Sequence, residues 1–359
     1  MNRKEKELFL ALCTLCNPPR ARLERLLLEG CATAGVLGLL FAHRVAGVAC
    51  DVLRRTALSE LAGPEFYRAL CGALLLGEKR SEEYLGCLGF LAGELEACGV
   101  PYALLDGACL CGRCPGARRV PDRVEVLVRP GDLGRVSTRL QLAGFRQGRL
   151  QNGRFVSAAR QQIPGYRQPE GGAVSFVRET RLPFFPALEV CLSAPVSPSS
   201  GDSAALCSIL ARTGSVPVGN GAVSARVPEP TDCLLDLCAR LYRTATALPL
   251  IRQGQDMPLE RYCEICLLLR DWEKTDLRRA LHRAQELGLR NALLYCLHSV
   301  AAFFGVPALC GLPLAPGEAR ALLEVSDPAA HRRWRYREAN PVRRFFAPDR
   351  LSLLQEVPA

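Results

Sequence analysis

The hydrophobic periodicity of the chain changes twice, and this change limits the folds open to it more than any other feature. Apolar residues recur at helical spacing over residues 1–98, as with Phe66 and Leu70. Over residues 99–225 short apolar runs alternate with glycine and proline, which is typical of strands and turns. Helical spacing returns from residue 226. The sequence therefore predicts an α+β fold, with a mixed sheet flanked by helical N-terminal and C-terminal parts.

The same changes set the expected organisation of the chain. We expect a helical part over 1–98, an α/β core over 99–225, a second helical part over 226–325 and a basic tail over 326–359. A long helix should begin at Pro64 and end at Gly99, because proline suits a first helical turn and glycine suits a helix end. The expected strands of the core are 102–105, 124–128, 173–177 and 187–192, with helices over 131–145 and 203–212. Residues 146–172 fit either a hairpin or a loose loop.

The net charge is +10, and only four of the 46 basic residues are lysine. This arginine excess fits either a compositional bias or a preference for phosphate-bearing partners, which the guanidinium fork binds well. The region from Arg332 to Arg344 holds six arginines, interleaved with Trp334 and Tyr336. It fits nucleic-acid binding, but a solvated tail is the favoured interpretation.

The N-terminal residues Met1 to Leu12 lack the layout of a signal peptide. The most apolar early run, Cys31 to Ala42, is shorter than the roughly 20 residues that a membrane span requires. We interpret this run as a buried helix. The expectation is a cytoplasmic protein with no membrane contact.

Eighteen cysteines are present, and a reducing cytosol argues against a disulfide framework. Two pairs, Cys13/Cys16 and Cys263/Cys266, have metal-like spacing, and Cys109, Cys111 and Cys114 form a dense trio. Metal binding would need four ligands. Buried thiols that act as small hydrophobic groups are the favoured alternative.

One stretch carries the pattern expected of a nucleotide site. A glycine turn after a strand lets phosphate approach backbone N–H groups, and here the turn is Asp106-Gly107. Acids at i and i+2 on a strand point to one face and can share a Mg²⁺ ion, which prefers oxygen ligands. On the second strand, however, those two positions hold Arg123 and Glu125.

The span from Cys31 to Pro307 resembles the uncharacterised nucleotidyltransferase-like proteins of the DNA polymerase β-type nucleotidyltransferase superfamily. That group has a Leu-Lys-Gly turn after a strand, a following arginine, an Asp-x-Asp strand running into Val-Arg-Pro, and a helix ending in Gly-Phe or Gly-Tyr. The corresponding stretches here are "GVPYALLDGACL", Arg119, "RVEVLVRPGDL" and "LAGF". A downstream acid-x-His strand corresponds to "LEVCL", which contains Glu189 and Cys191.

The resemblance implies Mg²⁺-dependent transfer of a nucleotidyl group from a nucleoside triphosphate to an unknown acceptor. It implies Glu125 and Glu189 as metal ligands and catalytic acids. Asp122, next to Arg123, is a further candidate catalytic acid, which would take the place of the lost acid if the strand began with a bulge. It implies contacts to the nucleotide from Gly107, Asp106, Arg119 and Arg123.

The departures from the family pattern favour a degenerate site. Arg123 replaces the first acid of Asp-x-Asp and places a fixed cation where the dication would bind. Two unit charges about 4 Å apart interact by about 4 kcal/mol at an effective dielectric constant of 20, enough to oppose a weak metal site. An ion pair between Arg123 and Glu125 is the favoured alternative to metal ligation, and it implies an inactive binding or regulatory protein. Three other residues have structural alternatives to a role in the site. Asp106 can cap the following helix, Gly107 can form an ordinary turn, and Asp122 can be an exposed loop acid.

Overall fold

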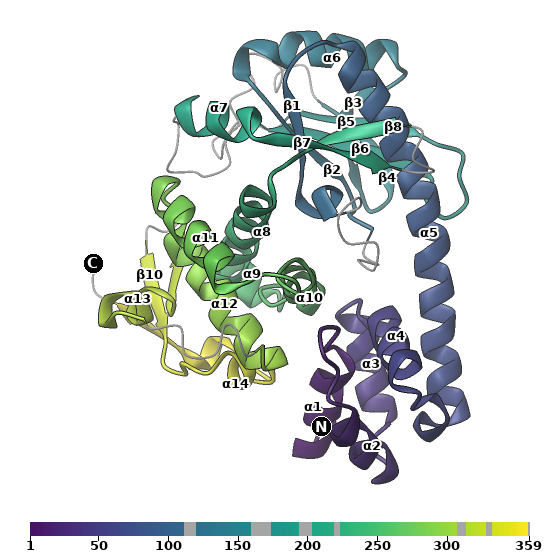
Figure 1. Ribbon diagram of the computed structural model, residues 1–359, viewed down its shortest axis with the longest axis vertical. Coiled ribbons are helices and arrows are strands. Elements are labelled where there is room, and N and C mark those ends of the chain that lie inside the picture. The colour runs from purple at the N-terminus through teal and green to yellow at the C-terminus, as the bar shows by residue number, and fades with distance from the viewer. Residues whose placement is uncertain are drawn as a thin grey trace. The chain divides into compact units, whose positions relative to one another are not determined.

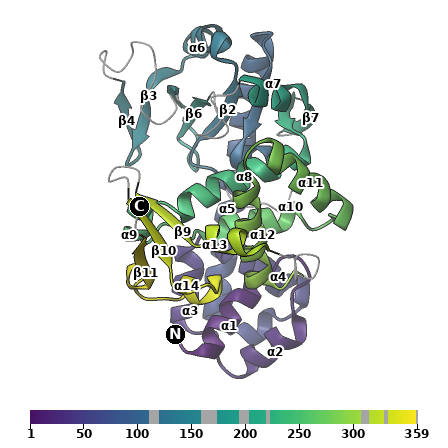
Figure 2. The same ribbon diagram turned by 90° about the vertical axis from the view of Figure 1, so that its left-hand side faces the viewer.

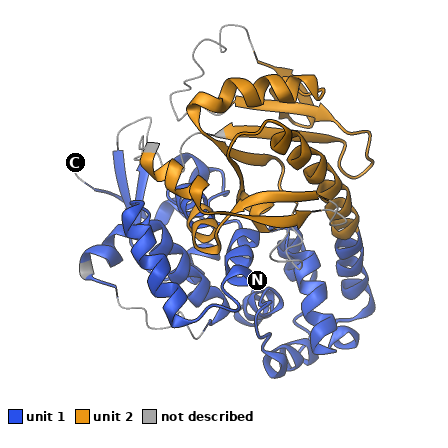
Figure 3. Ribbon diagram, turned by 45° about the horizontal axis from the view of Figure 1, so that its top comes forward, with its two compact units in different colours: residues 1–75, 237–359 blue, residues 76–236 orange. Residues whose placement is uncertain are grey.

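A computed structural model describes residues 1–110, 120–158, 174–193, 203–218, 223–306, 314–327 and 332–357. The chain divides into two compact units, coloured in Figure 3. Unit 1 comprises Met1–Leu75 and Leu237–Ala359, and unit 2 comprises Leu76–Asp236. The boundaries between the units fall within two helices, α5 (Pro64–Ala97) and α8 (Pro230–Ala245).

Unit 2 is built on a six-stranded sheet with the order β1-β2-β6-β5-β3-β4. The strands are β1 (Tyr102–Leu105), β2 (Val124–Val128), β3 (Arg146–Gln151), β4 (Arg154–Ser157), β5 (Val174–Glu179) and β6 (Ala187–Ser193). The β2–β6 pair is parallel and the other neighbouring pairs are antiparallel. In the chain, β1 is followed by η2 (Asp106–Leu110). Strand β2 is followed by η3 (Pro130–Asp132) and α6 (Leu133–Leu142). A mixed sheet flanked by helices confirms the predicted α+β class (Figure 1).

The region 146–172 begins with a hairpin, one of the two forms expected for it. Strands β3 and β4 pair at the edge of the sheet (Figure 2), and Gln151 faces Arg154 across the turn. The two residues between them, Asn152 and Gly153, have φ values of 51° and 73°. This is the left-handed pair that a two-residue hairpin turn needs, and Asn-Gly favours it. Residues 159–173 lie outside the described residues.

Gly148 in β3 has a backbone conformation that a side chain would strain. Its φ is 153°, and a Cβ atom would meet the Phe155 ring at 2.6 Å as well as the Val156 carbonyl. We expect Gly148→Ala to lower the free energy of unfolding by about 2 kcal/mol, measured by urea denaturation. The matched control is Gly134→Ala, because Gly134 lies in α6 with nothing within 4 Å of the added Cβ. That control should be neutral or slightly stabilising; equal losses in both variants would contradict the prediction.

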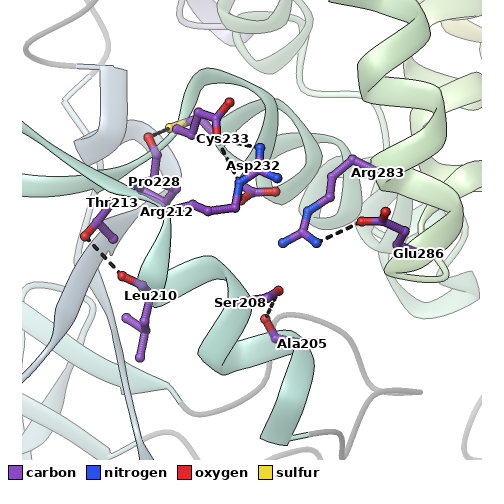
Figure 4. A network of polar contacts seen from close by, with 11 residues as sticks. Ala205, Ser208, Leu210, Arg212, Thr213, Pro228, Asp232, Cys233, Arg283 and Glu286 are labelled. Carbon is purple, nitrogen blue, oxygen red and sulfur yellow. Dashed lines mark hydrogen bonds and ion pairs between the residues drawn. The ribbon is translucent and has the colours of Figure 1, made fainter.

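A two-stranded sheet, β7 (Thr213–Val218) with β8 (Val223–Pro228), follows α7 (Ser203–Ala211). Neither strand was predicted from the sequence, because glycine, serine and proline obscure the alternation of buried residues Val216, Val218, Ala225 and Val227. Arg212 lies where α7 ends, and its Nε is 2.7 Å from a carboxylate oxygen of Glu229 and 3.5 Å from one of buried Asp232 (Figure 4). Arg212 thus links the end of α7 to the start of α8.

Unit 1 is mainly helical. Before α5 it contains α1 (Arg3–Leu12), α2 (Arg20–Leu28), α3 (Ala34–Ala42), α4 (Ala46–Thr56) and η1 (Ser59–Ala62). After α8 it contains α9 (Leu248–Arg252), α10 (Leu259–Leu268), α11 (Lys274–Glu286), α12 (Arg290–Phe304), α13 (Pro316–Ala321), α14 (Pro341–Phe345) and η6 (Leu351–Leu353). Asn2 begins α1 with a capping box to Glu5, which satisfies exposed N–H groups at the helix start.

The apolar run near the N-terminus forms α3, which is only partly the buried helix that we expected. Val36 and Leu40 are buried, whereas Phe41 is 47% exposed. Across the described ranges, no single helix is both long and apolar enough to cross a membrane. Helices α3 and α4 meet the length and composition criteria only as a pair, with a bend of 119° between them.

The basic C-terminal segment is folded, which differs from the solvated tail that the sequence favoured. Strands β9 (Glu324–Asp327), β10 (Arg332–Tyr336) and β11 (Leu354–Val357) form a sheet in the order β11-β10-β9. Tyr336 and Leu354 pack with Leu248, Ile251 and Val325 in a small core. Acids within the segment pair with its arginines, as Glu338 does with Arg343 at 3.5 Å. Internal neutralisation and this apolar core together explain why the segment can fold.

Two arginines of this segment contact the preceding part of unit 1. Arg350 binds Asp256, which is 0% exposed, with Nη2 2.7 Å and Nε 2.9 Å from the same carboxylate oxygen. Arg344 is 3% exposed, and its guanidinium carbon lies 5.9 Å from the ring centre of Tyr295 in α12. These contacts attach the C-terminal segment to the helical core.

Candidate active site

The turn after β1 is fixed by a long-range hydrogen bond. Asp106 begins η2 with φ 55°, a left-handed value that aspartate tolerates better than most residues. Its backbone N–H donates to Oδ2 of Asp236 in α8 at 2.8 Å. The Cys109 thiol donates to the carbonyl of Asp106 at 2.9 Å. Gly107 is buried in the same turn. The sequence thus placed the turn correctly, and α8 holds it in position.

Glu125 and Glu189 lie on one face of the sheet. In the parallel β2–β6 pair, Glu125 is opposite Cys191. Glu189 is two residues before Cys191 on β6, so its side chain points to the same side. The two glutamates are 3% and 7% exposed. This arrangement, two acids on adjacent strands, is the one expected from the sequence.

Arg123 forms the ion pair expected with Glu125. Its Nε donates to Oε1 of Glu125 at 2.6 Å, and the two side chains are 55% and 4% exposed. Burial opposes the charge of the guanidinium, but the negative charges of Glu125 and Glu189 outweigh this and raise the pKa of Arg123. A cation therefore stands beside the carboxylates where the family pattern has an acid.

Glu189 is engaged by the backbone of a third strand. Its Oε2 accepts a hydrogen bond from the N–H of Leu150 at 2.9 Å. Within the described ranges, β3 pairs with β5 through Arg146 and Gln147, and Leu150 lies beyond that ladder. The Glu189 carboxylate thus accepts the hydrogen bond that a neighbouring strand would otherwise accept from Leu150, and this gives Glu189 a structural role.

Cys191 is a buried thiol between the two glutamates. Burial, reinforced by the charge of Glu125, raises the pKa of Cys191 to about 12. The thiol is therefore protonated at neutral pH, and a protonated thiol is a poor metal ligand.

Two further predicted site residues stand elsewhere or cannot be placed. Asp122 is exposed, and its carboxylate lies 3.6 Å from Nη2 of Arg80. This agrees with the plain interpretation of a surface acid and gives no sign of a bulge that brings it to Glu125. Arg119 lies outside the described residues.

The chain matches the model of one protein family, described as uncharacterised nucleotidyltransferase, over residues 34–305. This match covers more than half of the chain. The protein belongs to this family. No curated protein matches the chain.

The side chains of this nucleotidyltransferase-family protein do not fit the magnesium ion that the family pattern implies. Magnesium needs several oxygen ligands in near-octahedral geometry. Glu125 is paired with Arg123, and Glu189 accepts from Leu150. In the described part of the chain, no group of three or more His, Cys, Asp or Glu side chains is arranged to hold a metal.

The described residues also show no metal-binding group at the two cysteine pairs with metal-like spacing, Cys13/Cys16 and Cys263/Cys266. The Cys16 thiol donates to the carbonyl of Cys266 at 3.4 Å, and the Cys263 thiol lies 3.7 Å from the carbonyl of Cys13. These backbone contacts and the burial of Cys13 agree with structural thiols. Of the trio, Cys109 is buried, and Cys111 and Cys114 lie outside the described residues.

Asp236 is the site residue that sequence reasoning missed. It is 2% exposed, and it binds a backbone amide 130 positions earlier in the chain. A signal was present: in "TDCLLDLC", Asp232 and Asp236 are one helical turn apart inside an apolar pattern. Because buried acids require partners, such a pattern indicates a specific polar contact.

Proposed function

We propose that this member of the nucleotidyltransferase family is a binding or regulatory protein that does not catalyse magnesium-dependent nucleotidyl transfer. The observation that supports the proposal is the 2.6 Å ion pair between Arg123 and Glu125. Transfer requires the α-phosphoryl group to pass from the triphosphate to a hydroxyl while pyrophosphate leaves, and metal ions normally neutralise the charge on those oxygens. A guanidinium at this position repels a dication and occupies the carboxylate that would bind it.

The proposed ligand is a nucleoside triphosphate, or a related polyphosphate, bound without magnesium. Arg123 is half exposed although its Nε is fixed by Glu125, so the outer part of the guanidinium faces solvent. Arginine binds phosphate oxygens in a bidentate manner. The cation that excludes the metal can therefore serve as the phosphate contact.

Thermal unfolding and pyrophosphate release test the proposal together. With millimolar MgCl₂ the unaltered protein should show no rise in Tm and should release no pyrophosphate from any nucleoside triphosphate. Arg123→Asp restores two acids spaced i, i+2 and should gain a magnesium-dependent rise in Tm, because a ligand that binds only the folded state stabilises it. Arg154→Asp, a charge-matched change at an exposed position of β4, should gain none.

Two outcomes would overturn the proposal. One is pyrophosphate release by the unaltered protein that requires magnesium and is lost in Glu125→Gln. The other is that Arg123→Asp, like the unaltered protein, shows no magnesium-dependent rise in Tm. Arg123 would then not be the group that excludes the metal.

A further inference from the structure

Two cysteines of unit 1 face each other across a helix pair. Cys50 in α4 and Cys71 in α5 have their sulfur atoms 3.6 Å apart. Disulfide bonds have a sulfur–sulfur length of about 2.0 Å. A movement of roughly 1.5 Å would therefore join these two side chains.

An arginine and a tyrosine complete the arrangement, each one helical turn from a cysteine. Arg54 follows Cys50 by four residues, and Tyr67 precedes Cys71 by four. Nη2 of Arg54 lies 3.7 Å from the sulfur of Cys71, and its Nε donates to the Tyr67 hydroxyl at 3.2 Å. Residues four apart share a helix face, so these four side chains meet where α4 packs on α5.

The two thiols differ in access and in charge. Cys50 is 0% exposed, whereas Cys71 is partly exposed. Burial acts to raise the pKa of Cys71, but hydrogen bonds with Tyr67, Cys50 and Arg54, together with the charge of Arg54, outweigh it and lower the pKa. Burial and the adjacent Cys71 raise the pKa of Cys50 to about 12. Cys71 is thus the accessible nucleophile and Cys50 the buried second thiol.

A second cysteine contact in unit 1 lacks this combination. The Cys296 thiol donates to the carbonyl of Cys238 at 3.6 Å, and both residues are 0% exposed. An oxidant in solvent has no access to either sulfur. Cys50 and Cys71 differ from this pair in two ways: their two sulfur atoms are 3.6 Å apart, and the partly exposed Cys71 lies beside Arg54.

We propose that Cys50 and Cys71 are a reversible dithiol–disulfide site whose oxidant is a hydroperoxide. The Cys71 thiolate attacks one peroxide oxygen, the O–O bond breaks, and the departing oxygen takes a proton, leaving a sulfenic acid on Cys71. The sulfur of Cys50 then attacks that of Cys71, the S–O bond breaks, and water leaves with the proton of Cys50. With hydrogen peroxide, two thiols lose two electrons in total and the peroxide becomes two water molecules. This site does not rest on the proposed function.

Peptide mapping tests the site directly. Cleavage after arginine and lysine gives peptides 45–54 and 69–79, each with one cysteine. The full-length protein is reduced, treated with hydrogen peroxide, then unfolded in urea with N-ethylmaleimide present so that buried thiols are also blocked, and digested without reductant. We expect the two peptides to be recovered mainly as one linked species, which dithiothreitol separates. Recovery of both as unlinked N-ethylmaleimide adducts, while other cysteines are oxidised, would overturn the proposal.

Matched variants assign the roles of the four side chains. Cys71→Ser should abolish the link and leave Cys50 as an N-ethylmaleimide adduct, whereas Cys50→Ser should leave a sulfenic acid on Cys71 that dimedone traps. Arg54→Gln should slow formation of the link severalfold, because the charge that favours the thiolate is lost. Cys207→Ser, at a partly exposed thiol of α7, should leave the linked yield unchanged. A link that forms equally fast in Arg54→Gln would contradict the role given to Arg54.

Discussion

Replacing Arg350 by alanine is expected to lower the free energy of unfolding by about 4 kcal/mol, because it leaves a fully buried carboxylate without its ion-pair partner. Asp256 is 0% exposed, and Arg350 contacts it through two nitrogen atoms. Burial raises the pKa of Asp256 even with the opposing charge of Arg350 present, which shows how unfavourable that environment is for an anion. Urea denaturation followed by circular dichroism gives the free energy.

The control for this variant is Arg337→Ala, in the same C-terminal segment. Arg337 is exposed and donates to the carbonyl of Ser352. Removing it should cost less than about 1 kcal/mol. Because Arg350 also donates to the carbonyl of Phe345, limited proteolysis of Arg350→Ala should cut first within residues 332–357. Similar stability losses in the two variants would show that burial of the pair is not what matters.

Replacing Arg123 by alanine is expected to lower the free energy of unfolding by about 3 kcal/mol. The asymmetry of exposure decides this value: the side chain of Glu125 is 4% exposed and that of Arg123 is 55% exposed. Loss of the arginine removes the counter-charge of a buried carboxylate. Loss of the acid, as in Glu125→Gln, leaves a guanidinium that is already half in water, so its cost should be about 1 kcal/mol.

A double-mutant cycle measures this pair. The double variant should lose less than the sum of the two single losses, because the penalty in Arg123→Ala arises only while Glu125 carries its charge. Arg154→Ala, at an exposed site in the same sheet, should change stability by less than about 0.5 kcal/mol. If Glu125→Gln proves the more damaging single change, the carboxylate is held chiefly by other contacts and the ion pair is secondary.

The sequence predicted what depends on local pattern. Strands β1 and β2 have the expected bounds because each is a short apolar run between turn residues. The Arg123–Glu125 pair was predictable because Arg123 directly precedes β2, and residues two apart in extended backbone share a face. The placement of Glu125 and Glu189 on one face agrees with the expectation, drawn from the resemblance, that the two acids share one site.

Features that depend on distant partners were not predictable. The contact from Asp236 to the Asp106 amide joins parts of the chain that no local pattern relates. The engagement of Glu189 by Leu150 depends on where β3 leaves β5. The folding of the C-terminal segment requires Asp256, 94 residues before Arg350, to supply the buried counter-charge.

The Asp106–Asp236 contact has a consequence for any anionic ligand of the turn. A phosphate that settled there in the manner of other glycine turns would seek the first backbone N–H as a donor. In this protein that donor already serves an internal carboxylate, 2.8 Å away and shielded from water. The polypeptide thus provides its own anion, and an incoming phosphate would have to displace Asp236 while being repelled by it. An anionic ligand therefore competes with the Asp236 side chain for the Asp106 N–H. Replacing that carboxylate by a neutral amide, as in Asp236→Asn, is the simplest way to remove the repulsion.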